Sequence, residues 1–324
     1  RGLFILAPSL PDPMPAMTAR APLLATAIAC LAPLIAAAEP GFAVRNEATL
    51  SRTATLPTLG ESRVLDAGQI ATRFTVDWSN EYVEQANARE TLTIDAETQR
   101  LTFGFRRGIA EGVEIGVDLP LLFTGGGALD GVIEGWHDAF SLPNGGRDRV
   151  RQDRYLVQYT VDGQTRISED QGANGIGDLE LSAGFRLRED FAFRALVKLP
   201  TGRSSRLQGG NAGGAMWFDF DPFHGAANWF GYLSAGASYS GQSDVIGAQQ
   251  KQLVALGGAA VGYRIWRPVS LLVQFNGHTA LHQDSGLAAL DRPGGQLSFG
   301  GRIDIAPKLQ LDLGVQEDVL VSSS

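Results

Sequence analysis

The chain has 324 residues, a formal net charge of -8 and a hydrophobic fraction of 44%. An acidic chain is poorly suited to a phosphate backbone, so nucleic acid is not an expected partner. Apart from one N-terminal segment, no apolar run reaches the roughly 18 to 20 residues that a membrane-spanning helix needs. A mean hydropathy of -0.03 still allows a membrane barrel, because half of the residues in each barrel strand are polar.

The first 38 residues are expected to lie outside the folded protein. Residues 1–16 are interpreted as a non-native upstream extension. Residues 17–38 combine a basic residue, an apolar stretch and small residues at the end, which is typical of a cleaved secretory signal peptide. The single cysteine, Cys30, lies in this segment, and lipid attachment there is the weaker alternative because the apolar run continues to Ala38. Cleavage leaves a mature chain without disulfides or thiolate metal ligands.

The next segment, 39–68, shows no clean periodicity and contains Pro40, Pro57 and Gly60. It is interpreted as a periplasmic leader or a plug-like segment. Residues 69–324 are interpreted as a separate β-barrel domain.

Apolar and polar residues alternate strictly through this second part of the chain. In the segment 176–188, for example, Leu181 and Phe185 alternate with Glu180 and Arg186. Since successive side chains of a strand point to opposite faces, such a strand has one apolar and one charged face. Repetition of this pattern without helical periodicity predicts an all-β fold, a transmembrane antiparallel up-and-down barrel of about 12 strands, with a range of 10 to 14. The expected strands are 69–79, 91–107, 112–123, 155–161, 176–188, 191–199, 217–223, 229–239, 253–265, 269–282, 296–305 and 309–316.

The connections between the expected strands alternate in length. Short turns are expected to face the periplasm and long loops the outside. The short turns are 107–111, 188–190, 263–268 and 306–308, and the long loops are 125–153, 201–216 and 283–295. Aromatic residues crowd the short-turn end, which predicts a membrane-interface belt. The cluster of Trp217, Phe218, Phe220, Phe223, Trp229 and Phe230 is assigned to this belt, with an apolar binding site as the alternative.

Two short turns predict which charged residues face each other inside the barrel. Counting back from the turn 188–190 places Glu180 opposite Lys198. Counting back from the last short turn places Arg302 opposite Asp312. Opposite charges paired across strands stabilise a sheet by roughly 0.2 to 1 kcal/mol each, so a structural role is expected for these groups.

Within the first long loop, over 127–147, the apolar residues recur at helical spacing. This pattern predicts a short amphipathic helix in an extracellular loop, ended by Pro143. The motif comprises Leu129, Asp130, Ile133, Trp136, His137, Phe140, Leu142, Pro143 and Arg147.

This motif resembles domain-of-unknown-function family 3187, a group of bacterial outer-membrane barrels. GIGDLELS from Gly175 and KLPTG from Lys198 are similar to later landmarks of that family. The resemblance covers 68–324 and implies a barrel in the cell envelope without an established activity. The family pattern continues with a terminal strand after Glu317 and Asp318, so the barrel is expected to lack its closing strand here.

Charged residues of both signs fall on the expected inner face. The lumen-facing candidates are Arg73, Asp77, Arg106, Asp118, Asp178, Glu180, Arg194, Lys198, His278, Arg302 and Asp312. A barrel of about 12 strands is narrower than the open porins with 16 to 18 strands. The leading hypothesis is therefore a non-enzymatic outer-membrane barrel that forms a narrow channel or a binding cavity for a small solute.

Two alternatives stay open. One is a lipid hydrolase at the membrane rim, for which Ser270, Ser298, His137 and His278 offer only loose positions. The other is an envelope structural protein whose outer loops bind a partner. Expected partners are outer-membrane lipid and the barrel assembly machinery, with a small solute as a possible third.

No catalytic residue, cofactor or metal is expected. His278 and His282 lie four residues apart on an expected strand, which separates them by about 13 Å, too far for one metal ion. A metal or acid–base cluster of His137 with Asp130, Glu134 and Asp138 is the weaker alternative to a role of His137 as a polar anchor of the loop helix.

Overall fold

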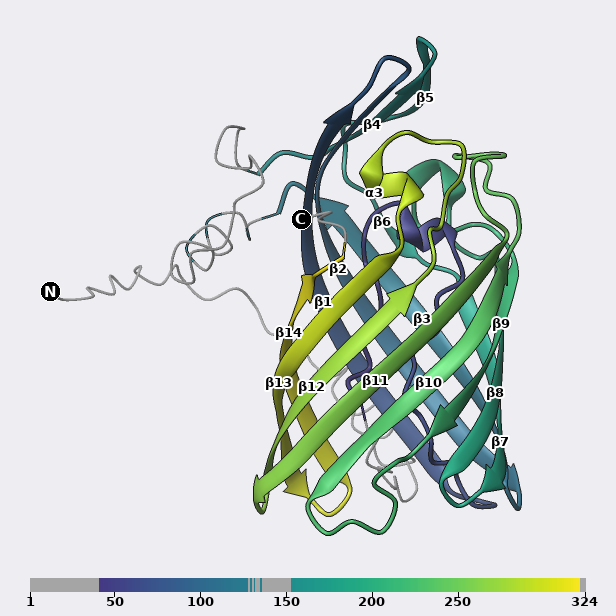
Figure 1. Cartoon of the computed structure of the whole chain (residues 1–324), viewed down its shortest axis with the longest axis vertical. Coiled ribbons are helices and arrows are strands. Elements are labelled where there is room, and N and C mark those ends of the chain that lie inside the picture. The colour runs from purple at the N-terminus through teal and green to yellow at the C-terminus, as the bar shows by residue number, and fades with distance from the viewer. Residues whose placement is uncertain (1–40, 128, 130, 132–134, 136–152, 321–324) are drawn as a thin grey trace, which may run out of the picture. The chain divides into compact units, whose positions relative to one another are not determined.

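A computed structural model describes residues 41–127, 129, 131, 135 and 153–320, all within one compact unit, Ile35–Ser324. These residues form one antiparallel sheet of 14 strands (Figure 1). Three short helical elements, η1 (Ser51–Thr53), η3 (Ser204–Arg206) and α3 (Ala288–Asp291), lie outside the strands. The strands are β1 (Ile70–Ala86), β2 (Glu90–Ala110), β3 (Val113–Gly125), β4 (Leu156–Val161), β5 (Gln164–Glu169), β6 (Asn174–Ile176), β7 (Leu179–Arg188), β8 (Phe191–Leu199), β9 (Gly213–Phe220), β10 (Trp229–Ser240), β11 (Leu253–Trp266), β12 (Val269–His278), β13 (Gly294–Ala306) and β14 (Leu309–Asp318). The predicted all-β antiparallel fold is confirmed.

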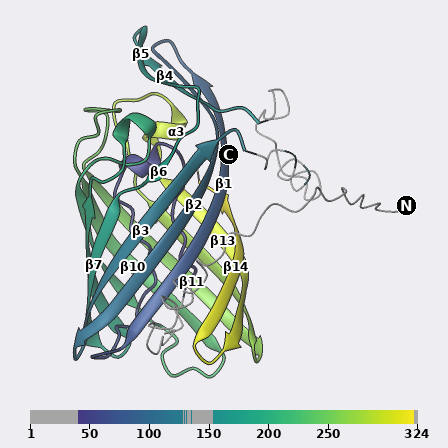
Figure 2. The same cartoon turned by 180° about the vertical axis from the view of Figure 1, so that it is seen from behind.

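Strands that are neighbours in sequence are mostly neighbours in the sheet, as an up-and-down barrel requires. The hydrogen-bonded order runs from β14 down to β7 and continues through β3 to β2, while β1 pairs with the other edge of β2. The strands are tilted and curl around a common interior, and β14 comes to lie beside β1 in both views (Figures 1 and 2). Among the described residues no backbone ladder joins β14 to β1, so the hydrogen-bonded sheet is open along this edge.

Strand β4 occupies a different place from the predicted one. The sequence predicts a barrel-wall strand at 155–161, but β4 extends the sheet beyond the long-loop end and forms a hairpin with β5 (Figure 1). The cause is the unequal length of β2 and β3. The second half of β2 pairs with β3, whereas Glu90–Asp95 extends past the end of β3 and pairs with β4. Backbone groups that β3 leaves free in β2 are thereby satisfied.

The hairpin registers match the sequence predictions. Glu180 lies opposite Lys198, and Arg302 lies opposite Asp312. A β-bulge adds one residue to one strand beside each of the four predicted short turns, which shifts the register by one residue and increases the local twist. The bulges lie at Gly108/Ala110, Arg186/Arg188, Arg264/Trp266 and Asp304/Ala306.

The two faces of the sheet differ in polarity. On β1, Phe74, Val76 and Trp78 are 58, 57 and 50% exposed on the outer face. The alternating residues Arg73 and Asp77 point to the inner face and are only partly exposed. The period of two in the sequence therefore separates an apolar exterior from a charged interior.

Several predicted segments lie outside the described residues. They are the upstream extension 1–16, the signal peptide 17–38 and most of the loop-helix motif within 127–147.

No helix in the described part of the chain has both the length and the apolar character needed to cross a membrane.

Candidate functional site in the barrel lumen

Residues 41–69, which we call the luminal segment, pass through the interior of the barrel (Figure 1, purple). The segment begins beside β13, where Arg302 Nη2 donates to the carbonyl of Gly41 at 3.1 Å. It turns at η1 near the long loops, where the carbonyl of Thr53 accepts from Asn211 Nδ2 at 2.6 Å. It then returns to the short-turn end and continues into β1. The lumen is thus crossed twice by the same segment.

The barrel wall binds the backbone of the luminal segment with side chains of both charge signs. The amide of Leu65 donates to Glu114 Oε2 at 2.7 Å, and Arg194 Nε donates to the carbonyl of Glu61 at 2.6 Å. An irregular backbone has no ladder of its own, so these wall groups satisfy donors and acceptors that would otherwise be buried without partners. Further contacts of this kind join Phe42 to Gln274, Thr49 to Glu81, Ala54 to Lys198, Thr55 to Ser240 and Arg45 to Gln316.

Five charged residues form the basal cluster, which lies toward the short-turn end: Glu61, Arg73, Arg106, Glu114 and Arg194. Glu61 Oε1 lies 2.8 Å from Arg73, and its Oε2 lies 3.2 Å from both Arg106 and Arg194. From the wall, Glu114 lies 2.7 Å from Arg194 and 3.1 Å from Arg106. Glu61 is the only member from the luminal segment, so its three ion pairs join the segment to three wall arginines.

The charge state of Glu61 follows from these contacts. Burial opposes its ionisation, but the attraction of Arg106, Arg194 and Arg73 is stronger and lowers the pKa of Glu61 to about 2. The carboxylate is therefore charged at neutral pH. Removing one partner from a buried ion pair is strongly destabilising, because it leaves an uncompensated buried charge.

The ion pairs of Glu180 and Lys198 differ from the predicted pairing of these two residues. Glu180 and Lys198 face each other in register, but they form ion pairs with other groups. Glu180 lies 2.7 Å from Arg45 of the luminal segment, and Lys198 lies 3.0 Å from Asp178. The predicted pair contained wall residues only, whereas the luminal segment supplies a competing cation, Arg45.

Arg302 and Asp312 form the ion pair that their register predicts. Arg302 Nε and Nη2 donate to the two carboxylate oxygens of Asp312 at 2.9 and 2.8 Å. The same guanidinium lies 5.3 Å from the ring centre of Phe230. Arg302 also holds Gly41, so it joins β13, β14 and the start of the luminal segment.

Two other predicted inner-face carboxylates lie near the luminal segment. Asp118 lies 3.0 Å from Arg73 and 3.9 Å from Arg45. Asp77 is half-buried on the same face of β1 as Arg73. Together with the ion pairs above, these contacts show that the predicted solute pathway is lined by groups that hold a part of the chain.

Asp178 connects two sequence landmarks that belong to the neighbouring strands β7 and β8. Its carboxylate accepts from the amides of Gly202 and Gly210 at 2.9 and 2.8 Å, besides its ion pair with Lys198. Thr201 Oγ1 donates to the carbonyl of Gly177 at 2.7 Å. The GIGDLELS and KLPTG segments therefore meet at one place, as the predicted register of Glu180 opposite Lys198 requires.

The ring of Tyr232 packs against two glycines of the luminal segment, Gly41 and Gly60. It is fully buried, and its hydroxyl donates to Asn276 Oδ1 at 2.8 Å. A Cβ at Gly41 or at Gly60 would overlap the Tyr232 ring, and Gly60 also has φ +92. The ring thus packs where only glycine leaves enough room.

The two histidines of the predicted strand 269–282 are arranged differently from the prediction. β12 ends at His278, so His282 lies in the following loop and the strand-based separation of 13 Å does not apply. Both line a cavity of about 50 Å³. His278 Nε2 lies 3.0 Å from Asn46 Nδ2, and its Nδ1 lies 2.9 Å from the carbonyl of Thr279.

Within the described part of the chain, no group of three or more His, Cys, Asp or Glu residues is placed to hold a metal ion.

Two aromatic residues of the lumen, Trp217 and Phe230, were not predicted from the sequence. Trp217 is 3% exposed, and its Nε1 donates to Asp219 Oδ2 at 2.9 Å. Phe230 packs against the same buried cluster. Their assignment to the membrane belt is wrong, although Phe218 and Trp229 from the same set are 45 and 50% exposed. The signal was available, since Trp217 follows the polar register of its strand and shares its face with Asp219.

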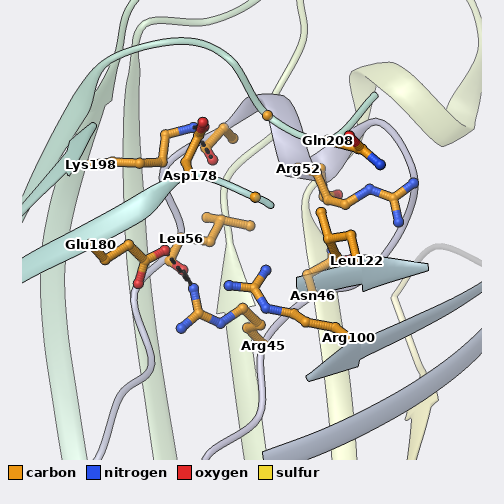
Figure 3. Close-up of a pocket in the computed structure, with 14 residues that line it drawn as sticks. Arg45, Asn46, Arg52, Leu56, Arg100, Leu122, Asp178, Glu180, Lys198 and Gln208 are labelled. Carbon is orange, nitrogen blue, oxygen red and sulfur yellow. Dashed lines mark hydrogen bonds and ion pairs between the residues drawn. The ribbon is translucent and has the colours of Figure 1, made fainter. Parts of the chain in front are cut away.

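A second cavity lies near η1, between the luminal segment and the wall (Figure 3). Its volume is about 30 Å³, and another cavity of about 30 Å³ lies next to Asn276 and His278. Each can hold only a few water molecules, at roughly 10 to 15 Å³ per molecule. The lumen is thus filled at these levels by the luminal segment and by wall side chains.

The fold and the lumen define an antiparallel β-barrel whose interior is occupied by the segment that precedes its first strand. The chain belongs to the family described as protein of unknown function (DUF3187), whose sequence model matches residues 22–324. The predicted family resemblance is confirmed.

Comparison with solved structures finds a similarity to the CymD monoaromatic hydrocarbon channel. The two are 12% identical in sequence, the match covers 78% of this chain and 84% of that chain, and the TM-score is 0.38. No curated protein matches the chain.

Proposed function

We propose that this protein is an outer-membrane β-barrel closed by its own luminal segment, and that movement of this segment opens a narrow pathway for a small solute. The observation that carries the proposal is the double passage of residues 41–69 through the lumen, bound to the wall on both passages. The signal peptide at 17–38, the outer-membrane location and assembly by the barrel machinery belong to the same proposal.

The exterior of the barrel supports a membrane location. Large apolar side chains point outward from strands all around the sheet, including Leu233, Leu271 and Leu313, which are 50, 54 and 60% exposed. Exposed apolar surface on this scale marks contact with lipid or protein. Near the short turns, Trp229 packs against Tyr263 with ring centres 4.7 Å apart. Such aromatic pairs are enriched where a barrel meets the membrane surface.

The chemistry of the contacts supports a segment that moves. Many of them are hydrogen bonds and ion pairs between polar groups, which water can replace when the segment leaves. Phe42 and Leu59 also pack in a buried apolar cluster with wall residues. A purely apolar core would lose its burial without compensation. An open state whose free energy lies a few kcal/mol above that of the closed state would be populated often enough to conduct.

A hydrolase is less well supported. Both ring nitrogens of His278 already have partners, Asn46 and the Thr279 carbonyl. The hydroxyl of Ser298 donates to Gln316 Oε1 at 3.2 Å. His278 is therefore not free to take a proton from a serine nucleophile, as a general base must. We propose a non-enzymatic role.

Deletion of residues 41–66 tests the proposal. In planar lipid bilayers, we expect rare, brief openings for the wild type and steady conductance for the deletion variant, because the segment no longer fills the lumen. Deletion of 156–169 removes the β4–β5 hairpin and serves as the control. The hydrogen bonds and ion pairs that hold the luminal segment remain, and only the packing of the hairpin against Leu50 is lost. A deletion variant that shows the heat-shifted band of a folded barrel but never conducts would refute the channel.

A further inference from the structure

The cavity near η1 contains an arginine with an unused binding edge. Arg52 belongs to the turn of the luminal segment and is 8% exposed. Its Nη1 donates to Thr98 Oγ1 at 2.7 Å, but its Nε and Nη2 have no hydrogen-bond partner. Among the described residues no carboxylate lies within ion-pair distance of Arg52. Burial lowers its pKa, against the attraction of Glu47 and Glu81.

Other arginines of this chain show which group binds to the Nε and Nη2 edge of a guanidinium. Nε and Nη2 point in the same direction, which suits two oxygens of one carboxylate or phosphate group. In this chain the edge holds a carboxylate in three ion pairs, each with two hydrogen bonds of 2.8 to 2.9 Å. The pairs are Arg89 with Asp162, Arg188 with Asp190, and Arg302 with Asp312. Arg52 offers this edge inside a cavity without such a partner.

A second side chain of the cavity is also unpaired. Gln208 is 1% exposed, and neither its Nε2 nor its Oε1 has a hydrogen-bond partner. It follows η3 in the loop that Asp178 anchors through Gly210. In Figure 3 its amide lies on the same side of the cavity as the guanidinium of Arg52. A ligand between them would meet three N–H donors.

The charges around the cavity favour an anion. Its cations are Arg45, Arg52, Arg100 and Lys198, and its carboxylates are Asp178 and Glu180. Both carboxylates are already paired, Asp178 with Lys198 and Glu180 with Arg45. Arg100 reaches Glu47 only at 3.6 Å. Among the cations that line the cavity, Arg52 is therefore the one without an ion pair in the described part of the chain.

We propose that Arg52 and Gln208 form a binding site for a small oxyanion, a carboxylate or a phosphate, held by the Nε and Nη2 atoms of Arg52 and by the amide of Gln208. The cavity volume of about 30 Å³ fits the head of one such group. The ligand joins the turn of the luminal segment to the loop after β8. The site is independent of conduction and is present in the closed barrel.

Calorimetric titration of the folded full chain in detergent tests this site, with acetate and inorganic phosphate as separate probes. We expect saturable binding of at least one probe. Arg52→Lys keeps the charge but loses the two-donor edge, so it should weaken binding about tenfold or more, as expected for hydrogen bonds to a charged group. Gln208→Leu should weaken binding in the same direction.

Arg188→Lys is the matched control, because its edge is occupied by Asp190 at an exposed turn, and it should bind like the wild type. Binding of acetate alone identifies a carboxylate site, and binding of phosphate alone identifies a phosphate site. No binding of either probe, or equal affinity in the wild type, Arg52→Lys and Gln208→Leu, would overturn the proposal. A barrel that binds acetate but never conducts would overturn the channel and leave this site standing.

Discussion

At the scale of single residues, Glu61 is the main electrostatic link between the luminal segment and the wall. It lies within 3.2 Å of three arginines. In Glu61→Gln these buried cations lose a shared anion, which should weaken docking by about 3 kcal/mol. We expect faster amide hydrogen exchange over residues 41–69, measured by mass spectrometry, and more frequent channel openings. Glu189→Gln, in an exposed turn, is the control and should change neither quantity. Unchanged exchange in Glu61→Gln would contradict the role of the cluster.

The same residue predicts a pH dependence. The pKa of Glu61 falls from 4.5 to about 2 when the segment is docked. Because the docked state has the lower pKa, this contribution to docking is complete above pH 4.5 and is lost as the pH falls from 4.5 through 2. Channel openings should therefore become more frequent over this range. In Glu61→Gln the frequency should be high and less dependent on pH, and an equal pH response in both proteins would exclude Glu61 as its source.

The substitution Gly60→Ala tests the packing of the luminal segment rather than its charge. An alanine at this position would overlap the ring of Tyr232 and would also be strained at φ +92. Gly68→Ala is the matched control, since Gly68 has φ +83 but no atom within 4 Å of the added Cβ. Both variants carry a backbone penalty of roughly 1 to 2 kcal/mol. Only Gly60→Ala should expose residues 41–69 to added protease, and equal cleavage of the two variants would contradict close packing against Tyr232.

At the scale of elements, the strands and hairpin registers could be predicted because a period of two and a short turn are local signals. Counting from the turns predicted the correct cross-strand neighbours of Glu180 and Arg302. The role of β4 could not be predicted, because it depends on β2 being longer than β3, which is a property of the sheet.

The position of the luminal segment inside the barrel could not be predicted from the sequence. Its prolines and lack of periodicity indicated an irregular segment and left its place open between a leader and a plug. Its contacts join residues far apart in the chain, such as Arg45 with Glu180 and Phe42 with Gln274. No short-range pattern encodes such pairs. The inner-face charges were visible in the sequence, but their partners were not.

At the scale of the whole molecule, the outer and inner faces of the barrel have different roles. The apolar exterior suits a membrane, while the charged interior binds a segment of the same chain. The lumen is then closed by a segment of the same chain. A crosslink between the luminal segment and the wall should keep it closed without any change in the outer surface.

The most direct test is a reversible lock of the luminal segment. Thr55 Oγ1 and Ser240 Oγ lie 3.3 Å apart, so Thr55→Cys with Ser240→Cys places two thiols within reach of a disulfide. The lock is made in a Cys30→Ser, Glu61→Gln background, which has no other cysteine and in which openings should be frequent. We expect the oxidised barrel to be silent in planar bilayers and to conduct after reduction, while each single-cysteine variant conducts under both conditions. Equal conductance before and after reduction, with the disulfide verified by mass spectrometry, would contradict closure by the luminal segment.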